Sequence, residues 1–246
     1  MKIVERPSPN FNERQGDAPV DILVLHYTGM PDAESAMKLL TTVEGNVSSH
    51  YTVDEDGTVY AHVAEKMRAW HAGVSSWGGA SDINSRSIGI EIVNPGHEFG
   101  YRPFAPAQVS AVIELCASII RRWPIPPARV LAHSDVAPGR KIDPGELFPW
   151  DELARRGVGR WPRSLLSNQV LMAIGPDERG ERVSHLQADL ARYGYGIEAS
   201  GVFDEPSQIV VSAFQRHFRR SRFDGIADGE TQLILADLLN QLDAVA

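Results

Sequence analysis

Two histidines and one aspartate in this chain are of the types needed for a metal site that performs hydrolysis. His26 and His133 each end an apolar segment, and Asp143 follows ten residues after His133 in a loop with several prolines and glycines. Two imidazoles and one carboxylate leave the fourth position of a tetrahedral zinc ion open for water, as in catalytic zinc sites. The same ligand set also suits iron, and each histidine taken alone is most simply a hydrogen-bonded structural residue.

Glu91 and Lys141 are the residues that would complete a hydrolytic metal site. A carboxylate can accept a proton from the attacking water, and a cation can stabilise the oxyanion that forms on the attacked carbonyl. The simpler alternatives are a solvated glutamate on an edge strand and an ordinary surface lysine. The spacing of His26, His133 and Asp143 matches no local metal motif such as HExxH, so the residues by themselves leave these alternatives open.

Strands that end at one edge of a sheet must position these residues. Residues 20–27, VDILVLHY, are apolar on both faces, as expected for a central strand covered on both sides. Residues 87–94, SIGIEIVN, alternate so that three isoleucines share one face and Glu91 lies on the other. A short strand over 129–133 leads into the loop that carries the aspartate, so the polar residues are expected to converge at the strand ends.

The remaining N-terminal elements predict an α/β domain. A helix is expected after Pro31, and residues 50–63, HYTVDEDGTVYAHV, predict a hairpin around Asp56-Gly57. Apolar residues between 109 and 120 follow i, i+3, i+4, i+7 spacing, which predicts a long amphipathic helix. Strands that alternate with helices and include one hairpin indicate a mixed central sheet flanked by helices.

The C-terminal part of the chain predicts a second, smaller domain. Helical patterns at 183–193, 206–219 and 230–242 are separated by turns that contain glycine. We therefore expect three parts, which are a catalytic domain over residues 1–162, a linker over 163–180 and a three-helix domain over 181–246.

The composition is that of an ordinary globular protein and excludes several classes. Of the 246 residues, 43% are hydrophobic and 23% are charged, which excludes disorder and coiled coil. The single cysteine, Cys116, excludes an intramolecular disulfide and a cysteine metal cluster. The net charge of −8 argues against nucleic acid as a partner, and no apolar run is long enough for a membrane span. The N-terminus has no apolar signal segment, so we expect a protein that is neither exported nor inserted.

Five segments of the chain, in order, resemble those of the type-2 N-acetylmuramoyl-L-alanine amidases. They are LVLHYTG, SSHYTVDEDGTVY, AWHAG, SIGIEIVNPG and HSDVAPGRKIDPG, and the resemblance covers about residues 18–162. The family consists of zinc enzymes related to phage amidases and to animal peptidoglycan recognition proteins. The resemblance implies the type-2 amidase fold, zinc ligation by His26, His133 and Asp143, a catalytic carboxylate at Glu91 and an oxyanion-stabilising cation at Lys141.

The resemblance also implies where a substrate would be bound. The residues that fall where family members line the groove for muramic acid and the stem peptide are Trp70, His71, Asn84 and Arg86. Arg86 could pair with a stem-peptide carboxylate through its planar guanidinium. His50 and Tyr51 lie on a strand expected near the metal, where some relatives use a tyrosine. Because Glu91 makes that role unnecessary, we interpret both as structural.

The C-terminal segment resembles the three-helix peptidoglycan-binding module found beside many wall hydrolases. LQADLARYGY, AFQRHF and DGIADGET carry this resemblance. Their apolar positions at helical spacing are core positions, so the resemblance identifies a fold rather than a ligand. Four arginines, Arg216, Arg219, Arg220 and Arg222, could contact an anionic wall polymer, although a solvated helix face is the simpler interpretation.

The predicted function is zinc-dependent hydrolysis of the amide between the lactyl carbonyl of N-acetylmuramic acid and L-alanine of the stem peptide. The closest resemblance is to amidases that accept 1,6-anhydro muropeptides in wall recycling. We therefore expect peptidoglycan fragments as partners, and a cytoplasmic location because a signal segment is absent. An envelope amidase, a phage-type lytic amidase and a non-catalytic peptidoglycan-binding or sensing protein are the alternatives. The oligomeric state stays open.

Overall fold

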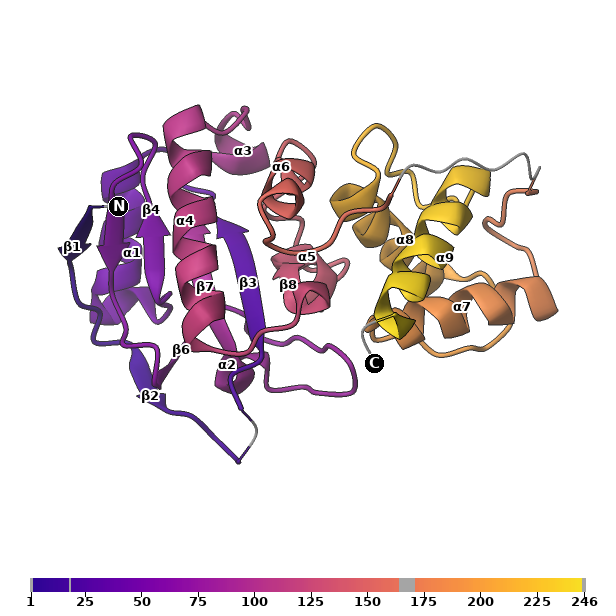
Figure 1. The fold of residues 1–246 in the computed structure, drawn as a ribbon, viewed down its shortest axis with the longest axis horizontal. Helices are drawn as coiled ribbons and strands as arrows, with labels where there is room; N and C mark the ends of the chain where they lie inside the picture. The colour runs from indigo at the N-terminus through magenta and orange to yellow at the C-terminus, as the bar shows by residue number, and fades with distance from the viewer. Residues whose placement is uncertain (1, 18, 164–170, 245–246) are drawn as a thin grey trace.

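The computed structural model describes residues 2–17, 19–163 and 171–244, in which an α/β domain is followed by three helices (Figure 1). The strands are β1 (Ile3–Glu5), β2 (Phe11–Glu13), β3 (Ile22–Tyr27), β4 (Tyr51–Val53), β5 (Val59–Ala61), β6 (Met67–Ala69), β7 (Ser87–Ile92) and β8 (Val130–Ala132). The α-helices are α1 (Ala33–Thr41), α2 (Ile83–Arg86), α3 (Gly96–Phe99), α4 (Pro106–Arg122), α5 (His133–Val136), α6 (Trp150–Arg155), α7 (Glu181–Tyr193), α8 (Glu205–Phe218) and α9 (Gly229–Asp243). The 3-10 helices are η1 (Val43–Gly45) and η2 (Pro127–Arg129). The predicted fold class is confirmed.

The central sheet is mixed and has the strand order β1-β5-β4-β7-β3-β8. Strands β4, β7, β3 and β8 run parallel, while β4 and β5 form the predicted antiparallel hairpin. The register pairs His26 of β3 with Glu91 of β7, and His133 directly follows β8. Because the carboxyl ends of parallel strands meet at one edge of a sheet, these three residues come together there.

Strand β3 is covered on both faces, as the sequence predicts. Leu23 and Leu25 pack in one core with the isoleucines of β7 and with α4, which lies across that face of the sheet (Figure 1). Ile22 and Val24 point the other way, into a second core that also contains the C-terminal helices. Each such fully buried aliphatic side chain stabilises the fold by about 1.5–3 kcal/mol. The polar residues at the strand end are therefore fixed by the most deeply packed part of the domain.

Side-chain caps fix the starts of three long helices. Asp32, Asp204 and Asp228 each accept a hydrogen bond from the backbone N–H three residues later, at the beginning of α1, α8 and α9. A cap of this kind stabilises a helix by about 1 kcal/mol. None of the helices in the described part of the chain is long and apolar enough to cross a membrane.

Several short elements are absent from the sequence prediction. Strands β1, β2 and β6 have three residues each, and helices α2, α3 and α5 have four. Such lengths are too short for hydrophobic periodicity to show. The predicted linker over 163–180 lies partly outside the described residues, and the predicted domain boundaries stay predictions.

The C-terminal helices share a hydrophobic core with the α/β domain. Trp77 and Val136 of the α/β domain pack in the same cluster as Tyr195 and Phe214. The rings of Trp77 and Tyr195 meet edge to face, with centroids 4.9 Å apart. Gly194 makes this approach possible, because a Cβ there would lie 2.3 Å from Trp77 Cε2. The two parts of the chain are thus joined by close packing.

A buried carboxylate, Asp135 of α5, lies at the centre of this interface. Its Oδ1 accepts a hydrogen bond from the Tyr195 hydroxyl at 2.7 Å, and its Oδ2 accepts from His217 Nδ1 at 2.6 Å. The same Oδ2 accepts from the Ala132 N–H at 2.8 Å. Since Asp135 lies two residues after His133, the C-terminal helices hold the segment that carries this histidine.

The four C-terminal arginines are paired with acidic side chains. The ion pairs are Arg216–Glu146, Arg219–Asp228, Arg219–Glu230, Arg220–Asp151, Arg222–Asp224 and Arg222–Asp228. Arg222 is half exposed, as a solvated residue should be, but it lies beyond the end of α8 and not on a helix face. The interpretation as a solvated helix face is also wrong for Arg219, which is nearly buried. Arg216 and Arg220 instead join α8 and the segment after it to the α/β domain.

Replacement of the buried carboxylate is expected to destabilise the whole chain. Asp135→Asn keeps the size of the side chain but weakens three buried hydrogen bonds, so we expect a loss of about 3 kcal/mol in the free energy of unfolding. Glu55→Gln makes the same chemical change in a half-exposed ion pair with Arg102 and should cost less than about 1 kcal/mol. Urea unfolding followed by two spectroscopic probes measures both. Equal effects of the two substitutions would contradict the structural role of Asp135.

Candidate active site

Three predicted ligand atoms meet at the carboxyl ends of β3 and β8. His26 Nδ1 lies 2.9 Å from His133 Nδ1, and Asp143 Oδ2 lies 3.2 and 3.0 Å from these two nitrogens. All three side chains, here called the ligand triad, are buried. The loop that carries Asp143 is tied to α5, because the Ser134 N–H donates to the Asp143 carbonyl at 3.0 Å.

The geometry of the ligand triad fits a tetrahedral metal ion. Ligand atoms about 2.0–2.1 Å from zinc at tetrahedral angles are about 3.3 Å apart, close to the separations observed here. His133 Nε2 lies 3.1 Å from the Ala72 carbonyl, which can only accept, and 3.4 Å from Arg140 Nη2, which can only donate. The shorter contact places the proton of this ring on Nε2, so the Nδ1 lone pair faces the triad. Buried acceptors that face one another need a cation between them, so the donor set favours a divalent metal.

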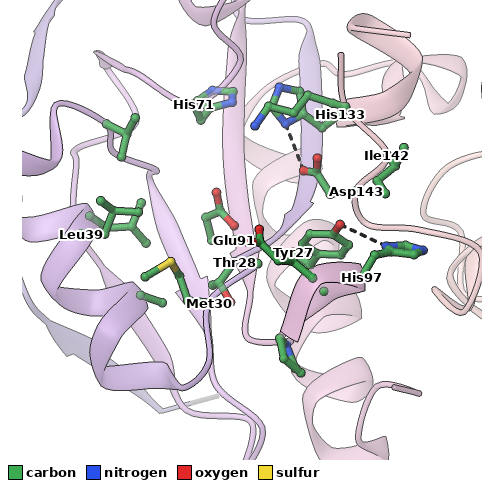
Figure 2. Close-up of a pocket in the computed structure, with 18 of the residues that line it drawn as sticks. Tyr27, Thr28, Met30, Leu39, His71, Glu91, His97, His133, Ile142 and Asp143 are labelled. Carbon is green, nitrogen blue, oxygen red and sulfur yellow. Dashed lines mark hydrogen bonds and ion pairs between the residues drawn. The ribbon is translucent and has the colours of Figure 1, made fainter. Parts of the chain in front are cut away.

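Glu91 of β7 lines a pocket that is also lined by His133 and Asp143 of the ligand triad. Figure 2 shows the Glu91 carboxylate between Leu39 of α1 and the side that carries His133 and Asp143. Its Oε2 is buried and has no hydrogen-bond partner among the described residues. Burial and the Asp143 carboxylate raise the pKa of Glu91 well above its ordinary value, while the Lys141 ammonium opposes this shift. An unpartnered carboxylate with a raised pKa is suited to accept a proton during hydrolysis.

The pocket around these groups has a volume of about 380 Å³ and mixed polar and apolar walls. Lys141 and Ile142 line it from the loop that carries Asp143, Leu39 lines it from α1, and Trp70 follows β6. Lys141 is exposed, so its ammonium can reach a bound substrate. Pockets of this size accommodate small organic ligands.

The family follows from a comparison with known proteins. The family model described as N-acetylmuramoyl-L-alanine amidase matches residues 16–146, which is more than half of the 246 residues. The chain belongs to this amidase family. A second model, for a peptidoglycan binding domain, matches residues 179–235 of the amidase.

Relatives match the amidase over nearly its whole length. The sequence is 41% identical over 234 residues to the N-acetylmuramoyl-L-alanine amidase AmiD of Escherichia coli, with 90% of this chain and 83% of AmiD covered. A complex of AmiD with anhydro-N-acetylmuramic acid-L-Ala-D-gamma-Glu-L-Lys matches with a TM-score of 0.79 at 38% identity and covers 94% and 98% of the two chains. AmpDh3 of Pseudomonas aeruginosa in complex with anhydromuramic pentapeptide matches with a TM-score of 0.80 at 33% identity and covers 93% and 96%. The similarity therefore includes the C-terminal helices.

The predicted substrate contacts of the amidase divide into two groups. Trp70 and His71 line the pocket. Arg86 lies at the opposite end of β7 from Glu91, where its Nε donates to Asp21 at 3.1 Å, so the predicted contact with a stem-peptide carboxylate is corrected to a structural ion pair. Asn84 is buried and accepts hydrogen bonds from two backbone N–H groups, so its predicted substrate contact is corrected to a supporting role.

His50 and Tyr51 are structural, as the sequence analysis predicts. His50 Nδ1 accepts from the Gly89 N–H at 2.9 Å, and its Nε2 donates to the Met67 carbonyl at 3.1 Å. The Tyr51 hydroxyl donates to Glu65 at 2.8 Å. Both side chains thus connect β4 to neighbouring segments.

A row of side chains along one wall of the pocket is not predicted from the sequence. The Tyr27 hydroxyl lies 3.1 Å from His97 Nδ1 (Figure 2). His97 Nε2 lies 3.2 Å from Glu146. Glu146 in turn accepts from Arg216 of α8 at 3.0 Å. Tyr27 and His97 line the pocket, so the row connects the C-terminal helices to the candidate active site. In the sequence, Tyr27 is marked merely as part of the motif LVLHYTG, and His97 directly follows the motif SIGIEIVNPG.

The buried histidines of the amidase predict a loss of stability in mild acid. Burial and the nearby Arg14 lower the pKa of His50 to about 3, whereas histidine in an unfolded chain titrates near about 6.5. Between these pH values the unfolded chain binds more protons than the folded chain, so the free energy of unfolding falls as the pH falls.

The substitution His50→Asn keeps an acceptor for the Gly89 N–H and removes one titrating group. Its free energy of unfolding should depend less steeply on pH between about 6.5 and about 4, by up to about 1.4 kcal/mol per pH unit. Urea unfolding of the wild type and the variant across this range measures how the free energy of unfolding of each depends on pH. The other histidines contribute equally to both proteins, so the difference between the two slopes reports on His50. Identical slopes would show that His50 is not held neutral by the fold.

Proposed function

We propose that this amidase is zinc dependent and hydrolyses the amide between 1,6-anhydro-N-acetylmuramic acid and L-alanine of the stem peptide. The observation that carries the proposal is the buried ligand triad, of which His133 and Asp143 line the same pocket as Glu91. Two solved relatives similar to the whole chain, AmiD and AmpDh3, hold anhydromuramyl peptides, which supports this substrate class. The family model supports the bond that is cleaved.

Each polar residue of the site has a separate role in the hydrolysis. When bound by the ligand triad, zinc would polarise the scissile carbonyl and lower the pKa of water to about 7. Glu91 accepts a proton from the attacking water and passes it to the amide nitrogen as the carbon–nitrogen bond breaks, so L-alanine leaves as a neutral amine. Lys141, on the loop that carries Asp143, supplies positive charge for the carbonyl oxygen as it becomes negative.

The biological role that fits this substrate is recycling of soluble wall fragments, and a cytoplasmic location stays a prediction. The pocket wall formed by Tyr27 and His97 is held from behind by Arg216 through Glu146. The C-terminal helices therefore support the pocket directly, which they can do without binding intact wall. A non-catalytic sensing role is disfavoured because the ligand triad is complete and two of its members, His133 and Asp143, line the same pocket as Glu91 and Lys141.

The role of Glu91 is tested by Glu91→Gln. This substitution keeps the size of the side chain and leaves the ligand triad intact, so the variant should bind as much zinc as the wild type. Release of stem peptide from an anhydromuramyl tetrapeptide, followed by mass spectrometry, should fall about 10²–10⁴-fold because no base accepts the proton. The exposed substitution Glu55→Gln serves as a control with wild-type turnover. Turnover by Glu91→Gln at the wild-type rate would contradict the proposed mechanism.

The competing biological roles are separated by the same measurement with two substrates. The wild-type protein is incubated with an equal mixture of anhydro-muropeptide and intact sacculi, with and without a chelator. Chelator-sensitive release from the soluble fragment supports the recycling role. Release mainly from sacculi supports an envelope or lytic amidase, and no release from either substrate supports the binding or sensing protein.

A further inference from the structure

Two consecutive residues of the AWHAG segment contact both histidines of the ligand triad. His26 Nε2 lies 3.0 Å from His71 Nδ1, and His133 Nε2 lies 3.1 Å from the Ala72 carbonyl. In each ring the nitrogen that faces away from the triad is therefore held by this segment. Both residues are buried, with His71 8% and Ala72 0% exposed.

One backbone carbonyl determines which ring nitrogens of His71 and His26 carry a proton. The Ile83 carbonyl accepts the hydroxyl proton of Ser87 at 2.7 Å. Because this proton is used, Ser87 Oγ accepts from His71 Nε2–H at 3.1 Å. His71 Nδ1 is then unprotonated and accepts from His26 Nε2–H. His26 Nδ1 consequently keeps its lone pair, which faces the other two ligand atoms.

The surrounding sequence makes room for the His71 ring and fixes its backbone. A Cβ at Gly89 would lie 2.4 Å from His71 Cγ, so the glycine of SIGIE is required by this ring. Asn84 Oδ1 accepts from the N–H groups of His71 and Ala72 at 3.1 and 2.8 Å. These contacts come from two different elements, β7 and α2, and both hold the segment in one place.

We propose that His71 is a positioning residue of the metal site, which holds His26 in the tautomer whose Nδ1 binds the metal. Ala72 does the same for His133 through its carbonyl. This inference rests on the proposed metal dependence and gives His71 a role other than the predicted contact with substrate. Hydrogen-bond partners of this kind typically change metal affinity by about 10–100-fold when they are removed.

The test is the zinc affinity of three variants of the full chain, measured by competition with a chromophoric chelator. His71→Leu removes the acceptor for His26 Nε2–H, so the dissociation constant for zinc should rise about 10–100-fold. His71→Asn places an amide oxygen near the position of Nδ1 and should bind within a few-fold of the wild type. His62→Leu removes another buried histidine, whose partners are Thr52 and the Arg6 carbonyl, and should leave the affinity unchanged.

The outcomes separate this inference from the proposed function. Wild-type zinc affinity in folded His71→Leu, or an equal loss of zinc affinity in His62→Leu, would overturn the positioning role of His71. Neither result would contradict zinc binding by the ligand triad. A wild-type protein that binds no zinc would overturn both.

A second measurement does not depend on the folding of a variant. Nitrogen-15 NMR of the metal-free wild-type protein should show His26 protonated on Nε2 and unprotonated on Nδ1. The opposite tautomer would overturn the inference.

Discussion

Three hydrogen-bond acceptors meet in the interior of this protein, and the surrounding structure serves to hold them there. The lone pairs of His26 Nδ1, His133 Nδ1 and Asp143 Oδ2 face one another at about 3 Å, an arrangement that is stable when a cation lies among them. The sheet supplies the rigidity, because β3 and β8 are parallel neighbours that end at this place. The AWHAG segment, held by Asn84, then orients the two imidazoles from behind.

The C-terminal helices act on the same site from the other side. Asp135, two residues after His133, receives hydrogen bonds from Tyr195 and His217 of the C-terminal part. Arg216 reaches the pocket wall through Glu146. A module whose fold resembles a peptidoglycan-binding domain thus supports the active site. Its arginines at positions 216, 219, 220 and 222 are paired with acidic side chains rather than presented to an anionic polymer.

Much of the site follows from the sequence, because residue type and strand position predict it directly. Polar residues at the ends of apolar strands had to converge, and the alternation of SIGIEIVN placed Glu91 on the side opposite the isoleucines. The partner of Arg86 could not be predicted, since Asp21 is 65 positions away and is brought near by the pairing of β3 with β7. The role of Asn84 could not be predicted either, because the one-turn helix α2 that carries it is too short to show a periodic pattern in the sequence.

Anomalous X-ray scattering at the zinc absorption edge, from a crystal of the zinc-loaded protein, shows directly whether the ligand triad binds zinc. We expect one strong peak at about 2.0–2.2 Å from His26 Nδ1, His133 Nδ1 and Asp143 Oδ2, with both Nε2 atoms still facing the AWHAG segment. A crystal in which zinc is absent from this place, or is bound through Nε2 of either histidine, would contradict it.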